Sequence, residues 1–158
     1  MSVPAFRVLD FSHVCISVSD MERSLAFYRD VLGLEPIFDV ALDGDGMAAA
    51  TGEVGAHGRM VGCKVPGSGV TLELLCFGHA RAASRGTGRG TGYTNISLSV
   101  DDLDASYDAL VAAGATPLQK PFVVGGVRMF FVADPDGTPI EVISFPRGAT
   151  TSAEHNGA

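Results

Sequence analysis

Two stretches of the chain alternate apolar and polar positions and then change to helical spacing. Residues 13–22 (HVCISVSDME) are repeated at residues 95–104 (NISLSVDDLD). Apolar side chains occupy every second position at the start of both copies, which predicts a β-strand with one buried face. An aspartate then precedes the helical spacing in both copies, as at a helix N-cap. The chain therefore contains a duplicated strand–helix unit.

A second pair of repeated stretches carries one acidic side chain within an apolar strand pattern. Residues 70–77 (VTLELLCF) correspond to residues 138–145 (TPIEVISF), with Glu73 and Glu141 at the same place. Arg59 and Arg128, each followed by a methionine, begin a third pair of corresponding strands. These patterns predict an α+β fold built from two tandem βαβββ modules.

The two modules, with the turn signals between them, predict most element boundaries. Strands are expected at residues 11–18, 35–40, 59–65 and 70–77, and again at 94–100, 116–124, 127–133 and 138–145. Helices are expected at residues 20–32 and 101–113, ended by Gly33 and Gly114. Residues 42–58, rich in Gly, Ala and Asp, are expected to form a loop or a poorly marked segment. A single domain would cover residues 9–146, with module one at 9–78, a Gly/Arg-rich linker at 79–92, module two at 93–146 and a disordered tail at 147–158.

Composition excludes several kinds of partner and location. With 158 residues, 46% of them hydrophobic and 18% charged, the chain is long enough for one well-buried globular domain. Its net charge of −7 gives no footprint for nucleic acid or an anionic membrane surface. No apolar run is long enough to span a bilayer, and residues 1–7 lack the features of a signal peptide. The cysteines Cys15, Cys63 and Cys76 lie in apolar strand patterns, which predicts buried free thiols in a reducing cytoplasm.

The repeated polar positions are the candidates for chemistry. An ionised glutamate inside an apolar strand is costly unless another group pairs with it, and this pattern occurs at both Glu73 and Glu141. His13 and Asn95 occupy matching places on the other repeated strand. If the modules pack about a pseudo-twofold axis, these four side chains converge. Their imidazole, amide and carboxylate groups suit a divalent ion.

Other interpretations of these residues stay open. Glu73 and Glu141 could form structural ion pairs with Arg59 and Arg128. Asn95 could serve only to cap or bridge, without binding an ion. The remaining histidines, His57, His79 and His155, lie in predicted loops or in the tail and are expected at the surface.

The order of these motifs resembles the vicinal oxygen chelate superfamily, which includes glyoxalase I, methylmalonyl-CoA epimerase, extradiol dioxygenases and the fosfomycin and bleomycin resistance proteins. The resemblance covers residues 11–145. It rests on residues 13–20 (HVCISVSD), 27–34 (FYRDVLGL), 100–104 (VDDLD) and 134–141 (DPDGTPIE). It implies one curved mixed sheet around a cleft with the helices outside, and a homodimer.

The resemblance also implies roles for the repeated polar residues. Family members place metal ligands on the first and fourth strands of each module, at positions held here by His13, Glu73 and Glu141. The fourth ligand is usually histidine in the enzymes, whereas this chain has Asn95. This difference disfavours the extradiol dioxygenase branch, which needs two histidines and one carboxylate.

The function implied by the resemblance is that of a metal-dependent lyase or isomerase of the glyoxalase or epimerase type. Its cofactor would be Mn²⁺, Mg²⁺, Ni²⁺ or Zn²⁺. A small-molecule substrate would chelate through two oxygens, and Glu141 or Glu73 would act as the catalytic base. The alternative is a metal-free protein that binds and sequesters a hydrophobic small molecule such as an antibiotic.

Overall fold

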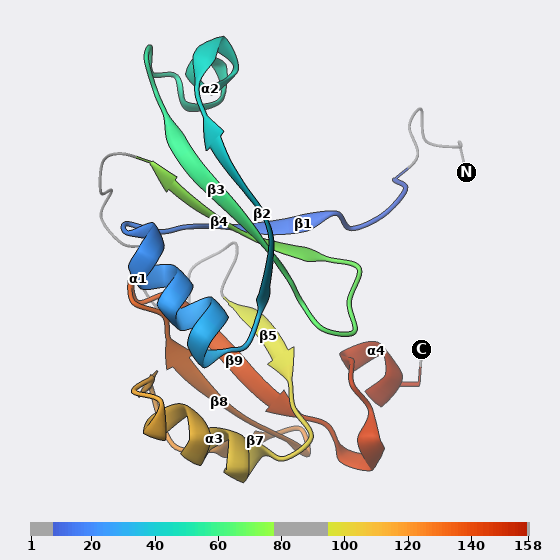
Figure 1. Cartoon of the computed structure of the whole chain (residues 1–158). Coiled ribbons are helices and arrows are strands. Elements are labelled where there is room, and N and C mark those ends of the chain that lie inside the picture. Colours follow the sequence, from blue (N-terminus) through green and yellow to red (C-terminus); the bar gives the residue numbers. More distant parts are fainter. Residues whose placement is uncertain (1–7, 78–94, 158) are drawn as a thin grey trace, which may run out of the picture. The chain divides into compact units, whose positions relative to one another are not determined.

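The computed structural model describes residues 8–77 and 95–157 (Figure 1). The first repeat comprises β1 (His13–Ser17), α1 (Met21–Leu25), the helical turn η1 (Ala26–Val31), β2 (Glu35–Leu42), α2 (Gly44–Thr51), β3 (Gly58–Lys64) and β4 (Thr71–Phe77). The second comprises β5 (Ile96–Ser99), α3 (Leu103–Ala112), β6 (Thr116–Pro117), β7 (Phe122–Val124), β8 (Val127–Ala133) and β9 (Pro139–Ser144), followed by η2 (Pro146–Gly148) and α4 (Ser152–His155). The predicted linker at residues 79–92 lies outside the described residues.

The strands form two mixed sheets, one for each repeat. Their strand orders are β1-β4-β3-β2 and β5-β9-β8-β6, with β7 also paired to β8. In each sheet the first strand runs parallel to the last strand of its repeat, and the other pairs are antiparallel. The predicted α+β class and the duplicated βαβββ order are confirmed.

The first sheet has one apolar, buried face. Ile16, Leu74 and Val61 are in register across β1, β4 and β3 and are at most 5% exposed. The alternate β1 positions His13, Cys15 and Ser17 are exposed, as the period of two predicts. Because the register sets Cys15 opposite Glu73, we call the side of the sheet that carries these residues the Glu73 face.

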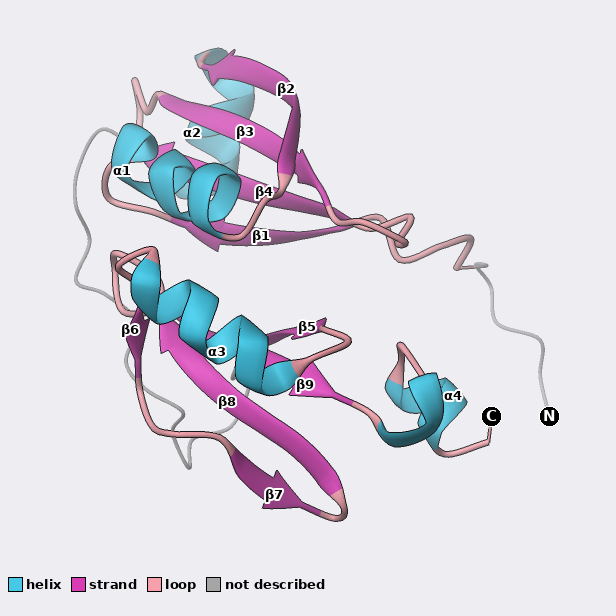
Figure 2. Cartoon of the chain, turned by 60° about the horizontal axis from the view of Figure 1, so that its bottom comes forward, coloured by secondary structure: helices cyan, strands magenta, loops and turns pink. Residues whose placement is uncertain are grey.

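The second sheet has α3 along one face (Figure 2). Asp102 begins this helix as predicted, because its carboxylate accepts a hydrogen bond from the Ala105 amide at 3.0 Å. Tyr107 of α3 contacts Phe130 of β8 edge to face, with ring centroids 5.1 Å apart. The opposite side of the sheet carries Glu141, and we call it the Glu141 face.

The helix after β1 packs with the compact unit that contains the second repeat. The described residues fall into two compact units, residues 8–21 with 33–77 and residues 22–32 with 95–157. The fully buried Tyr28 of η1 donates a hydrogen bond to Asp134, which follows β8. Phe27 packs edge-on against Tyr28 and is 7% exposed, so both rings belong to the core.

The predicted helix at residues 20–32 has a change of pitch. Five residues of α1 are followed by the π-helical turn η1, which ends before Gly33 at a φ of 73°. Gly114 also has a positive φ, of 85°. Both glycines therefore adopt the predicted left-handed conformation.

Three expectations differ from the structure. The predicted loop at residues 42–58 contains α2, because its Gly- and Ala-rich composition conceals a helix that buries no side chain. The predicted disordered tail contains the short helix α4, stabilised by a capping box between Thr151 and Glu154. Among the cysteines, Cys63 is buried, but Cys15 is exposed because it lies on the Glu73 face, and Cys76 is half-buried near the strand end. No helix in the described ranges is long and apolar enough to cross a membrane.

Candidate functional site

His13 and Glu73 form an imidazole–carboxylate pair on the Glu73 face. His13 Nε2 lies 3.6 Å from Glu73 Oε2, with side-chain exposures of 47% and 13%. The parallel pairing of β1 and β4 produces this contact, because it aligns Cys15 with Glu73 and leaves His13 two residues away on the same side. Two atoms bound to one ion at about 2.1 Å with tetrahedral geometry lie roughly 3.4 Å apart. The pair therefore fits two ligands of a single ion.

The other ring nitrogen of His13 is held by its neighbour. Nδ1 lies 3.0 Å from the hydroxyl oxygen of Ser12. In the tautomer whose Nδ1–H donates to that hydroxyl, the lone pair of Nε2 is directed to the side where Glu73 lies. The sequence carried no signal for this second contact, since a serine before a strand is common.

Glu141 occupies the corresponding place in the second sheet. The register sets it opposite Ser97 of β5 and Phe131 of β8. Within residues 8–77 and 95–157, its carboxylate makes no hydrogen bond or ion pair. A half-buried carboxylate in the middle of a sheet, with no such partner in these ranges, is available to bind a ligand or accept a proton.

The two repeats agree in register at these positions. His13 lies two residues before Cys15, which is the strand partner of Glu73. Asn95 lies two residues before Ser97, which is the strand partner of Glu141. Asn95 Nδ2 donates to the backbone carbonyl of Ile96 at 3.3 Å, so its amide nitrogen is engaged with the main chain. This contact reaches only the next residue along the chain and does not itself involve the amide oxygen. Ligation by the amide oxygen stays a prediction.

The alternative of structural ion pairs to Arg59 and Arg128 is wrong. Gly62 is the β3 residue opposite Glu73, so Arg59, an odd number of residues away, lies on the other side of that sheet. Phe131 is opposite Glu141, so the same parity argument excludes Arg128.

Both arginines pair with aspartates instead. Arg59 bonds Asp39 through two nitrogens at 2.9 and 2.6 Å, and Arg128 bonds Asp104 at 3.0 and 2.8 Å. These hydrogen bonds hold the pKa of Asp39 and of Asp104 below the usual value. Exposed pairs of this kind stabilise a fold only slightly.

Cys15 lies beside the pair but is a poor nucleophile. Partial burial, and secondarily the charge of Glu73, raise the pKa of its thiol. A raised pKa keeps the sulfur protonated at neutral pH, whereas reactive cysteines need a lowered one. Cys15 is therefore a neutral neighbour of the carboxylate.

Aromatic side chains accompany both glutamates. Phe131, opposite Glu141, stacks on Phe122 at a centroid distance of 6.2 Å. On the first sheet, the ring of Phe38 lies over Gly62, opposite Glu73. Sequence reasoning missed these rings because only the register reveals which strand positions share a face.

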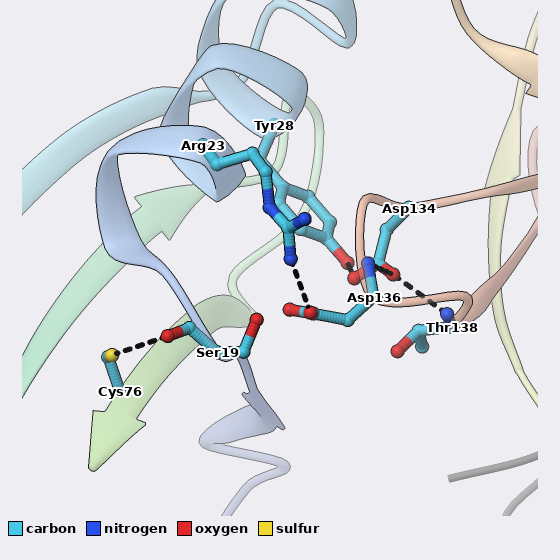
Figure 3. A network of polar contacts seen from close by, with 7 residues as sticks. All are labelled: Ser19, Arg23, Tyr28, Cys76, Asp134, Asp136 and Thr138. Carbon is cyan, nitrogen blue, oxygen red and sulfur yellow. Dashed lines mark hydrogen bonds and ion pairs between the residues drawn. The ribbon is translucent and has the colours of Figure 1, made fainter. Parts of the chain in front are cut away.

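The D-P-D-G turn at residues 134–137 is a structural centre rather than a ligand site (Figure 3). Asp134 is 4% exposed, and its Oδ1 accepts the amides of Asp136 and Thr138 at 2.9 and 2.7 Å. Its Oδ2 accepts the Tyr28 hydroxyl at 2.8 Å, while Arg23 pairs with Asp136 at 2.7 Å. The motif was recognisable in the sequence, but its partners on the distant helix were not.

The predicted ligand set draws on both compact units. Within either unit, the described His, Cys, Asp and Glu side chains form no group of three or more that could hold a metal ion. The sharing of one ion by His13, Glu73 and Glu141 therefore stays a prediction. Of the other histidines, His57 is exposed as predicted, His79 lies outside the described residues, and His155 is half-buried against Phe145.

Comparisons with known proteins agree with this fold. Residues 10–142 match the model of the Glyoxalase/Bleomycin resistance protein/Dioxygenase superfamily. The lactoylglutathione lyase of Haemophilus influenzae is 29% identical over 133 residues, which cover 83% of this chain and 89% of that protein.

Solved structures share the fold at lower identity. A glyoxalase family protein from Bacillus cereus has a TM-score of 0.77 at 18% identity, over 90% of this chain and 98% of that one. An antibiotic binding protein from Streptomyces sp. CB03234 has a TM-score of 0.61 at 22% identity, over 88% and 98%. With the duplicated βαβββ order and the extent of the matched segment, these findings show that the chain belongs to the Glyoxalase/Bleomycin resistance protein/Dioxygenase superfamily.

Proposed function

We propose that the protein is a metal-dependent lyase or isomerase of the glyoxalase or epimerase type, which moves a proton on a small substrate that chelates through two oxygens. The observation that carries the proposal is the His13–Glu73 pair, whose 3.6 Å separation suits two ligands of one ion. Glu141 would be the third ligand and Asn95 a weaker fourth. Their matching register in the second repeat supports this assignment.

The two glutamates have different surroundings, which favours different roles. Glu73 faces an imidazole, which favours a role in holding the ion. Glu141 has no polar partner in the described part of the chain, which favours it as the base that accepts a proton from carbon. A bound divalent ion would supply Lewis-acid polarisation of the substrate oxygens. The apolar side chains near Glu141 would limit access of water to the carboxylate.

Metal content and proton exchange together test this function. The protein is purified without chelator, its metal is measured, and it is incubated in D₂O with the adduct of methylglyoxal and glutathione. The name of the lactoylglutathione lyase relatives suggests this substrate. We expect close to one ion per chain, deuterium incorporation next to the carbonyl, loss of exchange after chelation and recovery on adding Mn²⁺. Exchange that survives complete metal removal would contradict the proposal.

A metal-free binding protein is the second candidate. Asn95, which stands where the enzymes usually have histidine, and the aromatic rings beside each glutamate favour it. An antibiotic binding protein from Streptomyces sp. CB03234 shows that this fold can serve binding. If this candidate is right, we expect the purified protein to contain no ion and to bind a hydrophobic small molecule equally well before and after treatment with chelator.

We also propose a cytoplasmic homodimer. The free cysteines fit a reducing compartment. Sedimentation equilibrium at micromolar concentration tests the assembly, with a mass of twice 16.4 kDa expected.

Asn95→His is expected to change the metal preference. An amide oxygen is a neutral, hard donor, so a site with Asn95 and two carboxylates should favour Mn²⁺ or Mg²⁺. Imidazole is a better ligand for Zn²⁺ and Ni²⁺, and the substitution should raise affinity for these ions by about tenfold more than for Mn²⁺. Competitive metal titration of both proteins measures the ratio. An unchanged ratio would mean that residue 95 does not contact the ion.

A further inference from the structure

The ring of Phe38 occupies the space that a side chain at position 62 would fill. A Cβ atom built on Gly62 would overlap Cε1 and Cζ of Phe38, so the ring lies directly over the glycine. Gly62 pairs with Phe38 on one side and with Glu73 on the other. Residues directly opposite in a sheet have their side chains about 5 Å apart. The aromatic ring therefore covers the β3 position directly opposite Glu73.

A β-bulge places Phe38 on this face. Pro36 pairs with Cys63 and Phe38 with Gly62, so Ile37 is an extra residue in β2. Without that residue the alternation would direct Phe38 to the opposite side of the sheet. Bulges that turn a side chain in this way are frequent beside functional sites.

The second repeat provides an aromatic ring at the same place by another route. Counting from the corresponding arginines Arg59 and Arg128, Gly62 corresponds to Phe131. Phe131 itself lies opposite Glu141, and its ring stacks on Phe122. Two different sequence solutions thus place an aromatic ring beside the position of each glutamate.

We infer that Phe38 determines specificity, and that the substrate joins its two adjacent oxygens to a planar aromatic or apolar substituent that packs on the Phe38 ring. This inference rests on the proposed function in placing the ligand oxygens near Glu73. Phe38 is only partly buried, and Val40, on the same face, is 39% exposed, so apolar surface is available to a ligand. An aromatic substituent gains both buried area and ring contact from this surface.

Mandelate and lactate are matched probes for this inference, because they share the same two oxygens and differ in a phenyl or a methyl group. Their affinities are measured by NMR titration of isotope-labelled protein with saturating Mg²⁺ and without metal. We expect mandelate to bind the parent protein about tenfold more tightly than lactate. Phe38→Leu should lower this ratio about three- to tenfold while changing lactate affinity less than twofold.

Gly62→Ala is the second variant, since its methyl group must displace the ring without removing it. It should also lower the ratio, whereas Val54→Ala, at a residue that is 96% exposed outside the strands, should leave it unchanged. Thermal unfolding verifies that each variant is folded.

The outcomes separate this inference from the proposed function. A preference for mandelate that depends on Phe38 but not on Mg²⁺ supports the inference and contradicts metal dependence. Binding that needs Mg²⁺ but shows equal affinity for both probes supports the function and overturns the inference. A ratio unchanged in both variants, or no binding of either probe, also overturns it.

Discussion

Asp134→Ala is expected to lower the free energy of unfolding by about 3 kcal/mol. The substitution removes one acceptor from the buried Tyr28 hydroxyl and another shared by the amides of Asp136 and Thr138. A buried donor left without an acceptor costs about 1–3 kcal/mol. For a chain of this length the midpoint of thermal unfolding should fall by roughly 6–12 °C. Denaturant titration and differential scanning calorimetry measure the two quantities.

Two matched variants identify the cause. Tyr28→Phe removes only the hydroxyl donor and should cost about 1 kcal/mol, because one hydrogen bond is lost and Asp134 keeps its amide donors. Asp134→Asn keeps an acceptor for those amides. Its loss of unfolding free energy should lie between the losses of the other two variants. If all three changes were equally small, the turn would not be the structural centre that its burial indicates.

His13→Ala is expected to reduce metal affinity by at least about 100-fold while leaving the fold intact. Loss of a residue that merely orients a ligand commonly costs 10- to 100-fold, and loss of the ligand itself should cost no less. The side chain of His13 is 47% exposed, so its removal should change unfolding free energy by less than about 0.5 kcal/mol. Equilibrium dialysis with Mn²⁺ and a parallel thermal melt measure both effects.

His57→Ala is the control for that variant. His57 is also exposed, and its ring lies 3.4 Å from the Gly55 carbonyl, outside the repeated strands. It should bind metal as the parent does. Equal affinity of the His13 variant and the parent would exclude His13 as a ligand and favour the binding-protein candidate.

Local patterns were enough to predict the elements and the faces of the repeated strands. The alternation around His13 has a period of two residues, and the cap at Asp102 involves a residue three positions away. Such signals depend on neighbours in the chain. Because the module is duplicated, each signal also occurs twice, and this repetition is what matches Glu73 with Glu141 in the amino-acid sequence alone.

Contacts that depend on register or on distant partners were not predictable. Arg59 faces Asp39 rather than Glu73 because of strand alignment, which the sequence does not state. The position of Phe38 depends on one bulged residue, and the partner of Tyr28 lies 106 positions away. In each case, a strand alignment shifted by one residue or a different packing partner would change which side chains lie together.

The assignment of Glu22–Leu32 to the second unit has a consequence for recombination. Residues 22–32 belong to the first repeat in the sequence, but they pack with residues of the second repeat. A cassette exchange that replaced only residues 93–146 with a homologous segment would bring in a foreign acceptor for Tyr28 and a foreign partner for Arg23. Productive chimaeras should therefore inherit this helix and the turn at residues 134–137 from the same parent. The natural crossover points lie at the two ends of the helix, near Met21 and Gly33, as well as between the repeats.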